Sequence, residues 1–314
     1  PRSRASSSTP ILERRSLMHA AFPRSFLFAL ALFIGACSLS TRLPAQQRLS
    51  APRSDGQSTP FLLYPAARAA SGCAPLAIIS HGAGGSEDGY RYLAQAMATL
   101  GYTTVVMSHA ESGMDALRAD MLRYGVMEGL TALVADPNAE QARLLDVGAV
   151  LKWADGRCRP PFRVLLGHSM GAETVMLEAG AKNIINVSSP PAAQDRFHAY
   201  VALSPEGPGI VFSGDAWSGI HKPMLILTGT RDQSLKGGPQ ARLVPWHELP
   251  GMESRCQWMG VIDGATHMNF AGNGLGRENV EPLVTKTIGD FLAGVRQKFC
   301  TPPTAVSGMK LQEK

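Results

Sequence analysis

The chain has 314 residues, of which 45% are apolar, and its mean hydropathy is −0.02. That length allows one large α/β domain or two small ones, and the composition fits a soluble globular protein. The net charge of +5 arises within residues 1–45, which hold six arginines and the single acidic residue Glu13. The remainder is neutral, so the charge gives no reason to expect a nucleic-acid partner.

The N-terminal segment predicts an export signal. Residues 25–36 form an apolar run after Arg24, about as long as the core of a signal peptide and too short to span a bilayer. We expect residues 1–45 to be this signal, with residues 1–17 upstream of a natural start at Met18. An uncleaved buried helix is the alternative interpretation of the run.

Two cleavage points fit the signal. Cleavage after Ala45, in "RLPAQQ", would release the protein into the periplasm or the medium. Cleavage before Cys37, in "FIGAC", resembles processing at a bacterial lipoprotein box and would leave the protein anchored by lipid.

The next segments predict one folded domain between flexible ends. Residues 46–60 are polar and rich in proline and serine, which is typical of a disordered linker. We expect the domain at residues 61–300 and a flexible tail at residues 301–314. Strand-like apolar runs within the domain alternate with stretches of helical period; these runs are residues 75–80, 102–109, 162–168, 199–205, 223–229 and 256–264.

Because these runs are apolar on both faces, they favour a mostly parallel sheet with helices on both sides, an α/β fold. The segment 111–140 is longer than a simple crossover and predicts a small helical elaboration over one end of the sheet. A last helix is expected at residues 280–299.

Apart from Cys37, the chain has four cysteines: Cys73, Cys158, Cys256 and Cys300. An even number in an exported chain predicts disulfides, with three possible connectivities. Neither CxxC spacing nor a histidine cluster accompanies them, so a zinc site is not expected. No cofactor is expected either, and we expect a monomer.

The sequence "VLLGHSMGAETVML" places Ser169 between Gly167 and Gly171, where a strand run gives way to a helix. A sharp turn there would lift the serine hydroxyl above the sheet and needs small residues on both sides. The start of the following helix would direct N–H groups to the same point. G-x-S-x-G alone is a weak motif, but this context indicates a nucleophile.

A serine nucleophile needs a histidine base that is oriented by a carboxylate. His267 lies just beyond the last strand run, at the end of the sheet where active sites form, whereas His198 and His221 flank strands at the opposite end. Asp232 directly follows a strand and is favoured as the acid, with Asp263 as the alternative.

The glycine-rich "IISHGAGGSEDGY" predicts the loop that completes an oxyanion hole. We expect the backbone N–H groups of Ala83, after His81-Gly82, and of Met170 to hold the oxyanion. The loop has neither of the phosphate-binding patterns G-x-x-x-x-G-K-[ST] and G-x-G-x-x-G, so a phosphate site is disfavoured.

From about residue 61 to residue 299 the chain resembles the α/β-hydrolase superfamily. The motifs "HGAGG", "GHSMGA", "ALSPEGPG", "PMLILTGTRD" and "GATH" are similar to those of exported bacterial hydrolases described as dienelactone-hydrolase-like or platelet-activating-factor-acetylhydrolase-like. True dienelactone hydrolases use a cysteine nucleophile, and this chain has Ser169, which argues against dienelactone itself as the substrate.

The resemblance also implies which cysteines pair. In that fold the strand before "HGAGG" and the nucleophile strand lie side by side and parallel. Cys73 and Cys158 each precede one of these strands at the same end, which implies a Cys73–Cys158 bridge and leaves Cys256–Cys300 as the second pair.

These residues together predict hydrolysis of a carboxylic ester outside the cytoplasm. Short-chain esters are the favoured substrates. Polyesters, chlorophyll-type esters and phospholipid acetyl esters are alternatives. His81, Trp217 and Trp246 are candidates to line the substrate pocket, although a loop tryptophan is as often a packing residue. His109 and Glu111 follow a strand and either border the site or belong to a surface loop.

Two other classes of protein stay open: a non-catalytic hydrolase-fold protein that binds a ligand, and a peptidase. Neither is favoured, because a binding protein needs no complete set of Ser, Asp and His, and no accessory domain of a peptidase is visible.

Overall fold

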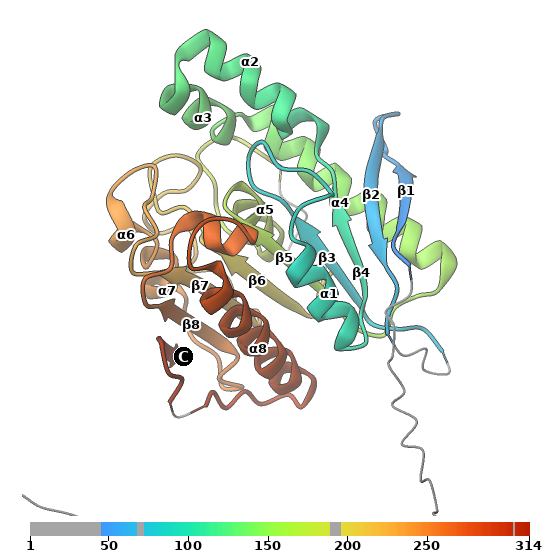
Figure 1. Ribbon diagram of the computed structural model, residues 1–314, viewed down its shortest axis with the longest axis vertical. Coiled ribbons are helices and arrows are strands. Elements are labelled where there is room, and N and C mark those ends of the chain that lie inside the picture. Colours follow the sequence, from blue (N-terminus) through green and yellow to red (C-terminus); the bar gives the residue numbers. More distant parts are fainter. Residues whose placement is uncertain (1–44, 68–71, 189–195, 304) are drawn as a thin grey trace, which may run out of the picture. The chain divides into compact units, whose positions relative to one another are not determined.

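A computed structural model of the chain describes residues 45–67, 72–188, 196–303 and 305–314. The predicted signal core, the start at Met18 and the lipid site at Cys37 lie outside these ranges. The described part is built on one nine-stranded sheet with the order β1-β2-β4-β3-β5-β6-β7-β8-β9 (Figure 1).

The six central strands are parallel and correspond to the six predicted runs. Almost all of their residues are buried on both faces, as expected for a sheet covered by helices on both sides. They are β3 (Leu76–Ser80), β4 (Thr103–Met107), β5 (Arg163–His168), β6 (Ala199–Leu203), β7 (Met224–Gly229) and β8 (Gln257–Ile262).

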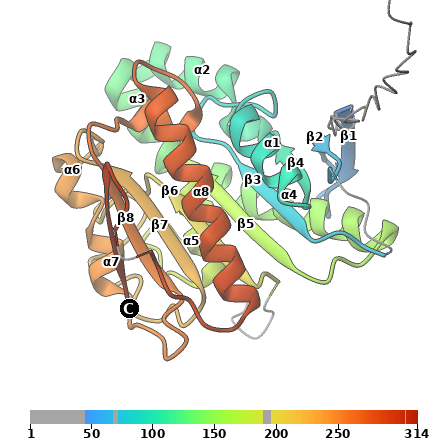
Figure 2. The same ribbon diagram turned by 60° about the horizontal axis from the view of Figure 1, so that its bottom comes forward.

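Helices cover both faces of the sheet. Figure 2 looks onto the face covered by α1 (Arg91–Thr99) and α8 (Arg277–Arg296), and α4 (Pro137–Arg157) and α5 (Met170–Ala179) lie behind the sheet. Each face has its own apolar core, with Phe291 in the first and Leu144 in the second. The predicted α/β architecture is therefore confirmed.

The expected disordered linker at residues 46–60 is wrong. These residues form the antiparallel strands β1 (Gln47–Pro52) and β2 (Ser58–Tyr64), and β2 in turn pairs antiparallel with β4. β1 is an edge strand whose side chains mostly face water, so its composition is polar although it is ordered. The Arg53 guanidinium anchors the hairpin by pairing with Asp146 of α4 at 3.3 Å.

The expected flexible tail at residues 301–314 is also wrong. Its end forms β9 (Met309–Glu313), which pairs antiparallel with β8 at the other edge of the sheet. Met309 is buried in the α8 core, and Lys314 donates hydrogen bonds to backbone carbonyls that end α7 (Val244–Glu248). A strand with only one buried residue in a polar sequence lacks the apolar run or the alternation from which a strand is predicted.

The predicted helical elaboration at residues 111–140 is present. A 3₁₀ turn η1 (Ala110–Ser112) leads into the helical hairpin of α2 (Met114–Tyr124) and α3 (Val126–Val134), which lies at the top of Figure 1 and contacts α4 through α3. Asp136 then caps α4 by accepting a hydrogen bond from the N–H of Asn138. Nowhere in the described ranges is a helix both long and apolar enough to cross a membrane.

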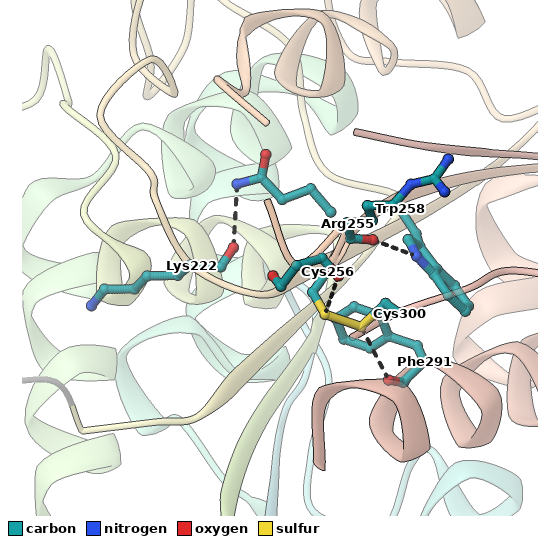
Figure 3. The surroundings of a disulfide bond; sticks show 8 residues. Lys222, Arg255, Cys256, Trp258, Phe291 and Cys300 are labelled. Carbon is teal, nitrogen blue, oxygen red and sulfur yellow. Dashed lines mark hydrogen bonds between the residues drawn. A yellow bond between two sulfur atoms is a disulfide. The ribbon is translucent and has the colours of Figure 1, made fainter. Parts of the chain in front are cut away.

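Both implied disulfides are present. Cys73–Cys158 joins the segments that precede β3 and β5, and Cys256–Cys300 joins the start of β8 to the end of α8, with Cα–Cα distances of 5.6 and 4.9 Å. Figure 3 shows the second bridge beside the ring of Phe291, which packs edge-on against Trp258. Both bridges lie at the end of the sheet where the parallel strands begin.

We expect the Cys256→Ser/Cys300→Ser double variant to fold with a lower free energy of unfolding, by about 2–4 kcal/mol, because this bridge closes a long loop in the unfolded chain. Urea unfolding followed by circular dichroism measures the change. The parent protein after reduction with dithiothreitol, which opens both bridges, gives the lower limit of stability. Equal unfolding midpoints for the oxidised parent and the double variant would contradict the prediction.

Candidate active site

Ser169 stands at the turn between β5 and α5. Its backbone has φ 56° and ψ −125°, a conformation that non-glycine residues rarely adopt. The turn leaves no room beside it: a Cβ atom on Gly167 would overlap the carbonyl of Gly171, and one on Gly171 would overlap the carbonyl of Ser80. The two glycines are thus required by close backbone contacts, as the motif predicts.

The structure brings Ser169, His267 and Asp232 together from three loops that follow β5, β8 and β7. His267 begins the 3₁₀ turn η2 (His267–Ala271), and its Nε2 lies 3.0 Å from Ser169 Oγ. Its Nδ1 lies 3.1 Å from Asp232 Oδ1. Asp263, the alternative acid, is exposed, and no hydrogen bond of its side chain to His267 is found in the described residues.

Asp232 is completely buried and has several partners besides His267. Thr228 Oγ1 donates to its Oδ2 at 2.7 Å, and the Arg242 guanidinium pairs with its Oδ1 at 2.8 Å. Burial alone would raise the pKa of Asp232, but the hydrogen bond from His267 and the charge of Arg242 outweigh it and hold the pKa below its usual value. The carboxylate is therefore ionised and fixed at neutral pH.

Two of these partners were not foreseen from the sequence. Ser204, at the end of β6, donates to Asp232 at 2.9 Å, and its Oγ also lies 2.6 Å from His267 Nδ1. Arg242 is buried and donates to the carbonyls of Ser204 and Pro205, both at 2.9 Å. Ser204 stands in the quoted motif "ALSPEGPG", which is the only signal for it, whereas nothing near Arg242 in the sequence marks its role.

His168, the residue before Ser169, links the site to the loop 81–85. Its Nε2 lies 3.0 Å from the carbonyl of His267, and its Nδ1 lies 2.8 Å from the hydroxyl of Tyr90. Burial lowers the pKa of His168 well below its usual value, and the nearby His267 lowers it further. The ring is therefore neutral, so its Nε2–H donates to the carbonyl and its Nδ1 accepts from Tyr90.

The loop with Ala83 lies directly against the nucleophile. A Cβ atom on Gly82 would be 3.2 Å from Ser169 Cβ. In the described part of the chain, neither the N–H of Ala83 nor that of Met170 has a hydrogen-bond acceptor. Unpartnered N–H groups beside a nucleophile are what an oxyanion hole requires, so the geometry fits the predicted pair.

The three residues expected to line the substrate pocket are all buried in the structure. Trp217 is completely buried, packs against Phe212 and points its Nε1 at Met176 Sδ. Trp246 belongs to the same core, and His81 is completely buried under its own loop. The two tryptophans turn inward because a large apolar ring gains free energy from burial in the core, whereas His81 is held by hydrogen bonds of both ring nitrogens to backbone groups.

Other side chains border the site instead. His109 is buried, so it does not line the site or belong to an exposed loop, and Glu111 is half-buried against Arg53. Leu117 and Met114 of α2 pack against Gly84, next to Ala83, and Met114 is 46% exposed. Met114 of the helical hairpin therefore presents an exposed apolar side chain beside the loop 81–85. Within the described ranges, no group of three or more His, Cys, Asp or Glu side chains could hold a metal ion.

Ser204→Ala should lower kcat for p-nitrophenyl acetate by about 10- to 100-fold, because it removes a hydrogen bond to a buried charged carboxylate. Steady-state kinetics at pH 7.5 measure the effect. Ser218→Ala is the matched control, since Ser218 is exposed and its hydroxyl bonds only the carbonyl of Asp215. A kcat equal to that of the control would show that Ser204 plays no part in orienting the site.

No protein-family model matches the chain, and no curated protein matches it. Solved structures do. Est1E from Butyrivibrio proteoclasticus has 17% identity and a TM-score of 0.54, covering 80% of this chain and 99% of that one. A putative dienelactone hydrolase from Klebsiella pneumoniae has 16% identity and a TM-score of 0.56, covering 81% and 98%.

The esterase domain of a Rhodothermus marinus protein has 14% identity and a TM-score of 0.51, covering 80% of this chain and 98% of that domain. Likeness at such low identity concerns the fold. It agrees with the parallel sheet, the turn at Ser169 and the order of Ser169, Asp232 and His267 along the chain. The chain has the α/β-hydrolase fold.

Proposed function

We propose that the protein is a serine hydrolase of carboxylic esters. The observation that carries the proposal is the continuous hydrogen-bonded series from Ser169 through His267 to Asp232, with distances of 3.0 and 3.1 Å. It stands beside two N–H groups that have no acceptor in the described residues. The fold shared with esterases supports the same reaction class.

In the first half of the reaction, Ser169 Oγ attacks the ester carbonyl while His267 Nε2 removes its proton. His267 Nδ1–H donates to Asp232, whose ionised carboxylate stabilises the imidazolium that forms. The Ala83 and Met170 N–H groups hold the negative charge on the former carbonyl oxygen. The tetrahedral intermediate then breaks its bond to the alcohol oxygen, which takes the proton from His267, and leaves an acyl group on Ser169.

In the second half, a water molecule attacks the acyl carbon as His267 again removes a proton. The tetrahedral intermediate collapses, Ser169 Oγ recovers its proton and the carboxylic acid leaves. His267 is 29% exposed and Ser169 is half-buried, so both water and substrate can reach them.

Small acyl groups fit the surroundings of Ser169 best. Trp217 and Phe212 are buried in the core beside α5, where they occupy space that a long acyl chain would need. The exposed apolar side chain of Met114 offers contact for a short alkyl group. We therefore propose esters of short acyl groups as substrates, ahead of polyesters.

We also propose that the protein is exported. The two disulfides support this, because such bonds persist in the periplasm and outside the cell and are rare in the cytosol. The apolar run at residues 25–36 supports the same conclusion from the sequence.

The purified protein should hydrolyse p-nitrophenyl esters with kcat/KM falling from acetate to palmitate, because the space at Ser169 suits small acyl groups. Ser169→Ala should lower kcat by about 10⁴- to 10⁶-fold, since it removes the nucleophile. Initial rates across the ester series measure both effects.

The Ser169→Ala protein must first show the parental circular dichroism spectrum and melting temperature. If that folded variant turned over acetate like the parent, Ser169 would not be the nucleophile. If the folded parent turned over no ester, a non-catalytic ligand-binding role would replace the proposed reaction.

A further inference from the structure

A second Ser–His–Asp array lies beneath the loop 81–85. Ser80 ends β3, His109 follows β4 and Asp146 lies on α4, and all three side chains are buried to 99% or more. Ser80 Oγ lies 2.9 Å from His109 Nε2, and His109 Nδ1 lies 2.7 Å from Asp146 Oδ2. The order of atoms is the same as in Ser169, His267 and Asp232.

The direction of these hydrogen bonds follows from the charge of the ring. Burial lowers the pKa of His109 well below its usual value, and the positive charges of Arg143 and Arg53 lower it further. A neutral ring has one N–H, which the short contact with the carboxylate of Asp146 places on Nδ1. His109 Nε2 then accepts the hydrogen bond that Ser80 donates.

Burial prevents this array from acting as a second nucleophile. Ser80 is completely enclosed, and its Oγ accepts a hydrogen bond from Arg143 Nη1 at 3.2 Å. The other carboxylate oxygen of Asp146 accepts a hydrogen bond from the hydroxyl of Thr59 at 2.6 Å and pairs with Arg53. The array therefore has no position that a substrate could reach.

Its contacts lead to the loop that carries Ala83. Arg143 Nη1 donates to the carbonyl of His81 at 2.7 Å, and Arg143 Nε donates to Ser112 Oγ at 2.8 Å. The carbonyl of Ser112 in turn accepts the N–H of Gly84 at 2.9 Å. One guanidinium thus restrains the loop on both sides of Ala83.

Two further hydrogen bonds complete the restraint. The backbone N–H of His109 donates to His81 Nε2 at 3.1 Å, which ties the loop to the array itself. The N–H of Gly82 donates to the hydroxyl of Tyr90 at 3.0 Å. The N–H groups of Gly82 and Gly84 are therefore bound, while that of Ala83 between them is left without an acceptor in the described residues.

We propose that Arg143 and the buried array of Ser80, His109 and Asp146 are positioning residues that hold the Ala83 N–H where the oxyanion forms. The inference rests on the proposed ester hydrolysis and assigns a role to four residues that do not touch the substrate. Asp146 also extends the network to Arg53 and Thr59 of the β1–β2 hairpin, which connects an edge of the sheet to the oxyanion hole.

The test compares Ser80→Ala and Asp146→Asn with Val150→Ala. Val150 lies on α4 one turn beyond Asp146, is completely buried and takes no part in the network, so its variant controls for lost stability. We expect kcat for p-nitrophenyl acetate to fall about 10- to 100-fold in the two network variants, with KM changed less than about threefold. Val150→Ala should lower the melting temperature about as much as the network variants do, but its kcat should equal that of the parent.

Inhibition by a short alkylboronic acid gives a readout specific to the oxyanion hole, because the boron adduct of Ser169 places an oxygen there. The inhibition constant should rise in the network variants by about the same factor as kcat/KM falls. If either variant fails to fold, Ser112→Ala takes its place, since it removes only the contact with Arg143 Nε and should show the same pattern.

Hydrogen exchange at the amides of Gly82 and Gly84 tests the network without any turnover. Exchange should be faster in the network variants than in the parent and in Val150→Ala. If kcat, inhibition and exchange of the network variants all match Val150→Ala, the proposal is overturned. If the parent hydrolyses no ester, the proposed function fails, and unchanged exchange would separately overturn the positioning role.

Discussion

The close contact between the end of β3 and the start of α5 is the constraint on which the rest of the site depends. The carbonyl of Ser80 lies where a side chain on Gly171 would have to stand, so α5 can approach β3 only with glycine at that position. This contact brings the turn at Ser169 and the loop 81–85 against each other. The packing of α5 against β3 therefore sets the positions of both the proposed nucleophile and the proposed oxyanion donors.

Two Ser–His–Asp arrays in one domain show how burial decides what the same three side chains can do. His267 is partly exposed and Ser169 is half-buried, so a ligand can reach them, as the proposed proton transfer requires. In the other array each polar side-chain atom of Ser80, His109 and Asp146 already has at least one partner in the core, and no substrate can reach it. The two arrays contain the same three residue types, so the difference between their proposed roles follows from how deeply each array is buried.

The sequence was sufficient to predict the parallel strands and to single out Ser169, Asp232 and His267, whose side chains the structure brings together, because apolar runs, turn glycines and chain order are local signals. It was insufficient where a residue acts through a distant partner. Arg242 approaches Asp232 through an irregular loop, and Trp217 turns toward α5, and neither contact has a local signature. The edge strands β1 and β9 were missed for a related reason: only one residue of each is buried, so the composition is that of a loop.

Three non-glycine residues at the site have left-handed backbones: Ser169, Ser204 and Tyr90, with φ of 56°, 54° and 55°. Such conformations each cost about 1–3 kcal/mol. Glycine would relieve that cost at Ser169, yet it would remove the hydroxyl. The proposed nucleophile is therefore held at the expense of stability, because the one residue that would relieve the strain carries no hydroxyl.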